Sequence, residues 1–198
     1  MGIFKWLAGK VTTEKAEEET EERLLIAALV NLKKALKYTD KTLKEITKIE
    51  KKIHSLKLFT LQEKRTLSMY HLKIINEGVN KIIIPLDFTN KCLESIKEKI
   101  EARKAVSSGY RRAVYSEKDR LLLNLVERVS ERDSEMIENL IAGKEEVKRN
   151  HQDIMIPTDW GFSHKSINIT VPEESFPRSK RMIEKSIKDL ENALASQA

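Results

Sequence analysis

Apolar residues recur at alternating steps of four and three along much of this chain, and that period constrains the fold more than any other feature. One seam comprises Leu25, Leu29, Leu32, Leu36, Thr39, Leu43, Ile46, Ile49 and Ile53. A second comprises Leu122, Val126, Val129, Asp133, Met136, Leu140, Gly143 and Val147. Such steps place side chains on one face of a long helix that packs against other helices. The pattern predicts an all-α protein.

Turn-forming residues are too few for a β-rich alternative. The chain has six Gly and four Pro among 198 residues, whereas a β-sandwich needs many turns. Thr60 and Glu63 form a capping box, which predicts a helix that begins at Leu61. Pro85 should end or kink this helix, and Asp87 could cap the next one. We therefore expect an elongated, coiled-coil-like antiparallel bundle of four to five helices.

Three features within the seams predict the burial of particular side chains. The run from Leu24 to Val30 is apolar around the whole helix, which predicts burial on several sides. Asp133 interrupts the second seam; we interpret it as a solvated position, with a register-fixing role or a position facing a gap as alternatives. Cys92 is at an apolar-spaced position and should be a small buried hydrophobe.

Four segments differ in composition. Residues 1–12 form a short amphipathic segment, 13–150 the long-helix bundle, 151–178 an extended loop with three of the four prolines, and 179–198 a C-terminal helix. Cys92 is the single cysteine and cannot form an internal disulfide, which favours a reducing compartment. No run approaches the roughly 18 apolar residues of a membrane span, and no cleavable signal is evident. We expect a cytoplasmic protein, with a peripheral position at the inner face of a membrane as the alternative.

Lysines recur at three- and four-residue steps in the first predicted helix, on the side opposite its apolar seam. This lysine stripe comprises Lys34, Lys37, Lys41, Lys44, Lys48 and Lys51. An ordinary solvated face mixes signs, because Glu and Lys four residues apart attract each other. A stripe of one sign, roughly 25 Å long, repels itself and suits an anionic partner. The alternative is a plain solvated face in a protein of net charge +6.

The residue types in the stripe indicate which anion it suits. Nucleic-acid recognition favours Arg for bidentate contacts and aromatic side chains for stacking, and the stripe has neither. Lysine binds as a diffuse point charge. The stripe therefore favours an anionic lipid surface or an acidic protein partner, with nucleic acid less favoured.

The N-terminal segment adds to this interpretation. Ile3, Phe4 and Leu7 share one helical side with Trp6 at its edge, and lysines flank them. This composition is typical of an interfacial membrane anchor. The alternative is that Phe4 and Trp6 pack on the end of the bundle. A segment this short binds membranes weakly unless copies are combined, so we also expect a homo-oligomer.

Residues 151–164 carry the only case for an enzyme. His151, Asp153, Asp159 and His164 offer acid–base or ligand atoms, but their spacing matches no ligand pattern. The chain also lacks a glycine-rich phosphate loop. We therefore predict no catalytic site, metal, cofactor or small-molecule substrate. Nearby, Trp160 and Phe162 either bind a partner or fix the loop onto the bundle.

The layout of the first 85 residues or so, an amphipathic segment followed by a long charged helical hairpin, resembles that of PspA and ESCRT-III-like membrane-remodelling proteins. Residues 169–178, Ile-Thr-Val-Pro-Glu-Glu-Ser-Phe-Pro-Arg, are faintly similar to proline-bearing tail segments by which ESCRT-III-like proteins bind a partner ATPase domain. The break at Pro85 and the regular final helices depart from that family. The resemblance is one of layout, and we infer no membership from it.

These observations lead to a functional hypothesis. We expect a non-enzymatic helical scaffold that docks on an anionic membrane surface through the N-terminal segment and the lysine stripe. A soluble protein–protein adaptor, whose helices complete a bundle with a partner, is the alternative. A helical nucleic-acid-binding protein is a lesser alternative.

Overall fold

The computed structural model describes residues 3–55, 61–107, 115–155 and 175–196, with the side chains of the first helix described from Thr20 onward. Its helices are α1 (Ile3–Ser55), α2 (Leu61–Ser107), α3 (Glu117–Met155) and α4 (Ser175–Ala195). Within these ranges only residues 115, 116 and 196 are not helical. The expectation of an all-α protein is confirmed.

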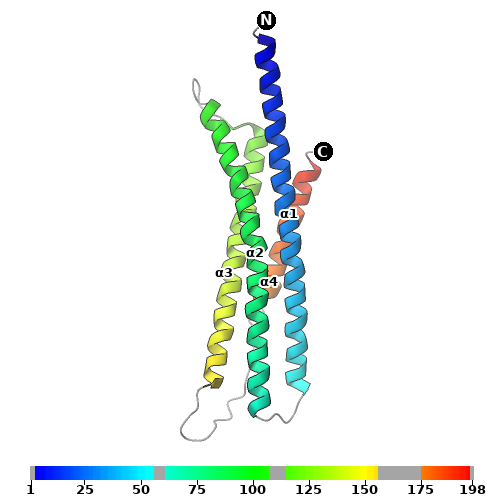
Figure 1. Ribbon diagram of the computed structural model, residues 1–198, viewed down its shortest axis with the longest axis vertical. Coiled ribbons are helices and arrows are strands. Elements are labelled where there is room, and N and C mark those ends of the chain that lie inside the picture. Colours follow the sequence, from blue (N-terminus) through cyan, green and yellow to red (C-terminus); the bar gives the residue numbers. More distant parts are fainter. Residues whose placement is uncertain (1–2, 56–60, 108–114, 156–174, 197–198) are drawn as a thin grey trace.

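The helices form a square in which each packs against two neighbours. α1 packs against α2 and α4, and α3 packs against the same two helices from the opposite corner. Lys33 pairs with Glu191 and Asp40 pairs with Lys180, so α1 and α4 are antiparallel. The other neighbouring pairs are antiparallel in the same way (Figure 1). α1 and α3 therefore run in the same direction at diagonally opposite corners.

The buried side of α1 differs in part from the predicted seam. Leu25 and Leu32 are fully buried as expected, but Leu29, Leu36 and Leu43 are only partly buried. Small residues, including Ala28 and Ala35, take their place in the core. Small side chains allow two helix backbones to approach closely, and large aliphatic residues of α2, α3 and α4 fill the remaining core.

Pro85 does not end the second helix, which corrects the prediction of a break there. α2 continues through it from Leu61 to Ser107. The Thr89 hydroxyl lies 3.0 Å from the Pro85 carbonyl oxygen and 3.4 Å from the Ala28 carbonyl oxygen of α1. Leu86 and Thr89 are fully buried. Packing on both sides thus outweighs the one backbone hydrogen bond that proline removes.

Helix ends agree with local capping signals. α2 begins at Leu61, the residue that the capping box predicts. At the start of α3 the Asp119 N–H donates to Ser116 Oγ at 3.0 Å, and the Ser116 hydroxyl donates to Asp119 Oδ2 at 2.8 Å. α4 begins at Ser175, and Pro177 falls in its first turn, where a missing N–H costs little.

Two predictions about burial are wrong. Asp133, interpreted as a solvated position, is fully buried on α3. In the run from Leu24 to Val30, predicted to be buried on several sides, Ile26 and Val30 are 44% and 46% exposed. Ile26 and Val30 are exposed because α1 packs against α2 and α4 and leaves one side open. Asp133 instead lies on the buried side of α3, with Val129 and Met136. Cys92 is half-buried beside the core, and burial raises the pKa of its thiol.

Candidate functional site

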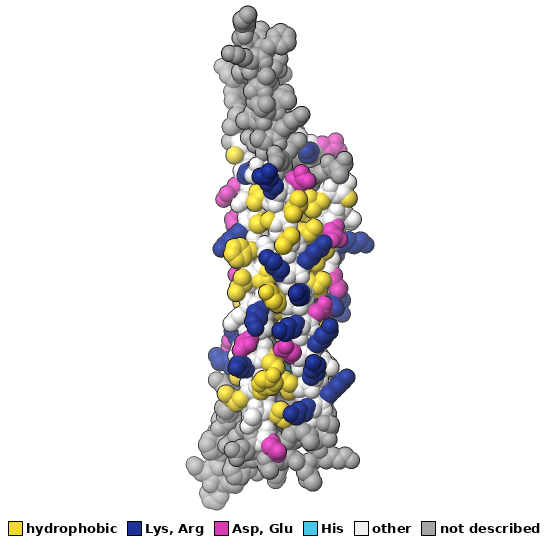
Figure 2. All heavy atoms as spheres, turned by 45° about the vertical axis from the view of Figure 1, so that its right-hand side comes forward, with side chains coloured by type: hydrophobic (Ala, Val, Ile, Leu, Met, Phe, Trp, Pro, Cys, Tyr) yellow, Lys and Arg dark blue, Asp and Glu magenta, His cyan; other side chains and the backbone are white. Residues whose placement is uncertain are grey.

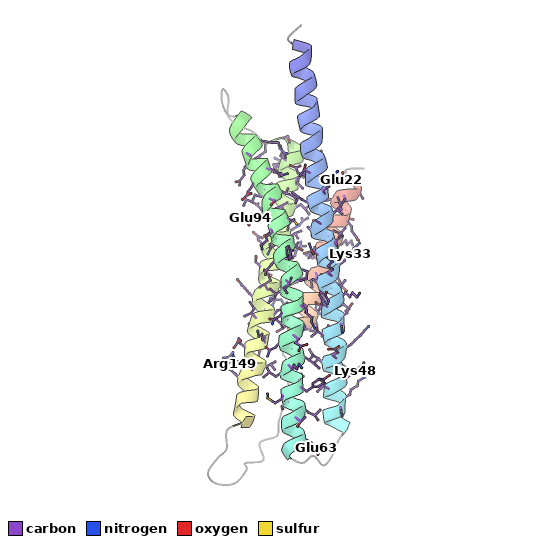
Figure 3. All side chains as sticks on the ribbon, viewed as in Figure 1. Glu22, Lys33, Lys48, Glu63, Glu94 and Arg149 are labelled. Carbon is purple, nitrogen blue, oxygen red and sulfur yellow. The ribbon has the colours of Figure 1, made fainter. Side chains whose placement is uncertain are left out.

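All six residues of the lysine stripe are exposed on the outer side of α1. They alternate with buried residues such as Thr39, Thr42 and Ile46, which face the bundle. Figure 3 shows Lys48 on the outer side of the helix, away from its neighbours. Among the side chains that the structure describes, Lys41 is the one stripe residue in an ion pair, 4.0 Å from Glu45. The stripe is thus an open row of cations.

Other charged residues of α1, at its edge with α4, are neutralised by ion pairs with α4. Asp40, an acid near the middle of the stripe, lies 2.8 Å from Lys180 of α4. The hydrogen bond from Lys180 to Asp40 raises the pKa of the lysine. Lys33 is likewise paired with Glu191, at 2.7 Å. The lysine stripe beside them keeps a single sign.

The fold adds cations that the sequence analysis missed. Arg181, Lys185 and Lys188 are exposed on α4, the neighbour of α1. Figure 2 shows dark-blue side chains spread over this side of the molecule, with acidic side chains among them. The four- and three-residue steps between the three residues are a sequence signal for an outward row. Only the pairing of α1 with α4 brings the two rows onto one surface. We call the lysine stripe together with Arg181, Lys185 and Lys188 the basic face.

The other predicted site residues lie outside the described side chains. This holds for Ile3, Phe4, Trp6 and Leu7 and for Trp160 and Phe162. The backbone of the N-terminal segment is helical from Ile3 and continuous with α1. Because Glu21 pairs with Arg103 near the end of α2, the earlier part of α1 extends beyond α2 (Figure 1).

The described residues provide no arrangement for metal binding or membrane spanning. They contain no group of three or more His, Cys, Asp or Glu side chains that could hold a metal ion. No helix in the same residues is long and apolar enough to cross a membrane. His151, Asp153, Asp159 and His164, the residues of the enzyme hypothesis, lie outside the described side chains. His71 is described and is fully buried on α2.

Comparison with known proteins does not assign a family. No family model matches the chain, and neither the curated proteins nor the solved structures include a significant match.

Proposed function

We propose that the protein is a non-enzymatic helical scaffold that docks on an anionic lipid surface through its basic face. One observation carries the proposal: the six stripe lysines are all exposed, and five of them are unpaired within the described residues. A straight row on a rigid helix suits an extended charged surface better than a small ligand.

The expected strength of docking follows from the number of cations. A lysine near an anionic membrane contributes about 1 kcal/mol, and the attraction falls off within a Debye length of about 8–10 Å. Several lysines on one side of one helix can approach the surface together. Their contributions combine without the entropy cost of ordering a flexible tail, because α1 already fixes their backbone. Binding should be weakened by salt.

The test compares triple variants of equal net charge. Lys34→Gln, Lys41→Gln and Lys48→Gln should weaken binding to vesicles containing phosphatidylserine by roughly 100-fold, since three lysines contribute about 3 kcal/mol. The control replaces Lys73, Lys81 and Lys91, which are exposed on α2, with Gln. Equal losses of affinity in the two triple variants would show that binding depends on net charge alone and not on the lysine stripe. No binding by the parent protein at low salt would refute lipid docking.

The N-terminal segment needs a separate test. We propose that Ile3, Phe4, Trp6 and Leu7 insert at the interface and add to the electrostatic attraction. Replacing Ile3, Phe4, Trp6 and Leu7 with Ser keeps every charge, and this variant should then bind anionic vesicles more weakly with the same salt dependence. An unchanged affinity would leave the basic face as the complete docking site.

A second candidate, the protein–protein adaptor, is favoured by an apolar patch on α2. Ile84 and Phe88 are four residues apart and 57% and 53% exposed. The Lys91 ammonium lies 5.5 Å from the centre of the Phe88 ring. Replacing Ile84 and Phe88 with Ser should leave vesicle binding unchanged. If the patch binds a helical partner, the double variant should lose that partner in affinity capture, while the lysine-stripe variant keeps it.

A further inference from the structure

A row of glutamates follows the outer side of α3. It comprises Glu127, Glu131, Glu138 and Glu145, all exposed, at steps of four, seven and seven residues. These positions lie opposite the buried Val129, Met136 and Leu140. At 1.5 Å per residue the row is roughly 27 Å long, close to the roughly 25 Å of the lysine stripe. We call it the glutamate stripe.

The carboxylates of the glutamate stripe are available to a partner. Within the described residues Glu131 and Glu138 have no ion pair. Glu127 is 3.5 Å from Lys97, and Glu145 is 3.7 Å from Lys148. Exposed pairs of this kind contribute little and exchange readily. The stripe is thus an open row of anions.

The two stripes lie on opposite sides of the molecule at about the same height. α1 and α3 occupy diagonal corners and run in the same direction. On α4, Lys180 contacts Asp40 of α1, and Arg178, two residues earlier, contacts Glu135 of α3. The middle of the lysine stripe is therefore level with the middle of the glutamate stripe.

We infer that the partner of the lysine stripe in solution is a second copy of this chain, docked through its glutamate stripe. With both copies parallel and at one height, Lys37 faces Glu131 and Lys44 faces Glu138. The same register pairs Lys34 with Glu127 and Lys51 with Glu145. Because the two stripes are on opposite sides, an assembly of any number of copies still has one lysine stripe and one glutamate stripe uncovered at its two ends. Such a head-to-tail contact gives open rows, not a closed dimer.

The inference goes beyond lipid docking and does not require it. On a vesicle, a copy that binds lipid through α1 would present its glutamate stripe away from the membrane. That stripe is a new anionic surface for the basic face of another copy. Association in solution can be measured without lipid, so the two proposals can fail separately.

The first measurement is the mass of the wild-type protein in solution, by sedimentation velocity at rising protein concentration. At about 50 mM salt the weight-average mass should increase continuously above the 22.9 kDa monomer. At about 500 mM salt it should return towards the monomer, because the paired charges are screened. A mass that stays at the monomer value in low salt at every concentration would overturn the inference.

Charge reversal then tests which residues make the contact. Glu131→Lys with Glu138→Lys should abolish association, and so should Lys37→Glu with Lys44→Glu. The matched control, Glu94→Lys with Glu98→Lys, changes two exposed acids of α2 and should associate like the wild type. Mixing the two stripe variants should restore association, because each then carries the complement of the other. Failure of the mixture to associate, or equal loss in the control, would contradict the assignment.

Vesicle binding separates this result from the proposed function. The Glu131→Lys, Glu138→Lys variant keeps every cation of the basic face, so it should still bind anionic vesicles. Loss of association with lipid binding retained supports the second-copy interface alone. Lipid binding by a protein that never self-associates would refute this inference and leave the proposed function standing.

Discussion

Gly78 of α2 lies so close to Thr42 of α1 that no larger side chain fits without movement. A Cβ added at Gly78 would lie 2.6 Å from Thr42 Oγ1 and would also overlap Thr42 Cγ2. The Thr42 hydroxyl donates to the Tyr38 carbonyl at 2.8 Å. Rotating this β-branched side chain away would break that bond and leave its preferred rotamer. The two helices therefore approach each other closely at this point.

Gly78→Ala should consequently destabilise the protein although alanine is the better helix former. The gain in helix propensity is about 1 kcal/mol, while overpacking a close contact costs about 1–3 kcal/mol or more. We expect a net loss of about 1 kcal/mol in the free energy of unfolding, measured by urea denaturation. Thr42→Ala in the same chain should recover most of it. Equal stability of Gly78→Ala and wild type would show that the helices are farther apart.

Asp133 should lower stability at neutral pH. Burial raises the pKa of its carboxyl well above the usual range, and the charge of Arg132 lowers it only in part. Arg132 instead contacts Asp189 at 2.6 Å, and neither carboxyl oxygen of Asp133 has a hydrogen-bond partner among the described residues. The folded state therefore holds this proton to higher pH than the unfolded chain does. Its contribution to stability is greatest below the unfolded pKa and is lost as pH rises towards the folded pKa.

The Asp133→Asn variant tests whether the buried carboxyl lowers stability at neutral pH. The variant should be more stable than wild type at pH 7, because Asn is neutral at every pH whereas wild type must hold the Asp133 carboxyl protonated in the folded state, at about 1.4 kcal/mol for each pH unit above the unfolded pKa. The difference should shrink as pH falls through about 4, because the carboxyl of Asp133 in the unfolded wild type becomes neutral only below its ordinary pKa of about 3.9. Urea denaturation of the two proteins across this pH range gives the comparison. A difference that grows at low pH would mean that the carboxylate is stabilised by a charge in the folded state.

Arg103 joins three helices, and its loss should be costly. It hydrogen-bonds to Glu21 of α1 and, at 2.6 Å, to Asp119 of α3. Burial disfavours the charged guanidinium, but the two carboxylates outweigh burial and raise its pKa. Glu21 is only 5% exposed, so removing its partner leaves a nearly buried charge.

Arg103→Ala should lower the free energy of unfolding by about 2 kcal/mol, somewhat less than for a fully buried pair. The matched control is Arg178→Ala, which removes the exposed pair with Glu135 and should cost at most about 1 kcal/mol. Thermal or urea unfolding compares both with wild type. Equal effects in the two variants would mean that Arg103 is no more than a surface residue.

Local signals were sufficient for much of the fold. The period of the apolar residues predicted long helices because burial of one helix face repeats every three to four residues. The start of α2 at Leu61 followed from Thr60 and Glu63, since capping depends on a few neighbouring groups. The antiparallel arrangement of neighbouring helices was also predicted, as is usual for helical bundles of this kind.

The features that depend on neighbouring helices were not predictable in the same way. Pro85 was expected to break α2, but the backbone there is held by packing against α1 and α3. Asp133 was interpreted as a solvated position, whereas the packing of α3 against its two neighbouring helices leaves it fully buried. The basic face was predicted only along α1, because the contribution of Arg181 and its neighbours depends on α4 packing beside α1.

The single sign of the lysine stripe leads to a final prediction: a change that reduces its self-repulsion should raise stability and weaken docking on lipid. Lys37 is four residues from both Lys33 and Lys41, and like charges at this spacing each cost about 0.2–0.5 kcal/mol. Lys37→Glu should therefore raise the free energy of unfolding by up to about 1 kcal/mol. It should also weaken binding to anionic vesicles by roughly 30-fold, because two units of charge are changed.

Lys73→Glu makes the same change in charge on α2 and should act in the opposite direction on stability. Lys73 is 3.9 Å from Glu77, so the variant replaces an attraction with a repulsion and loses a few tenths of a kcal/mol. Its effect on vesicle binding should be small, because it leaves the basic face intact. If Lys37→Glu gained stability without losing lipid affinity, the self-repulsion of the stripe would serve no docking role. In that case the second-copy interface would be the remaining explanation for a row of one sign.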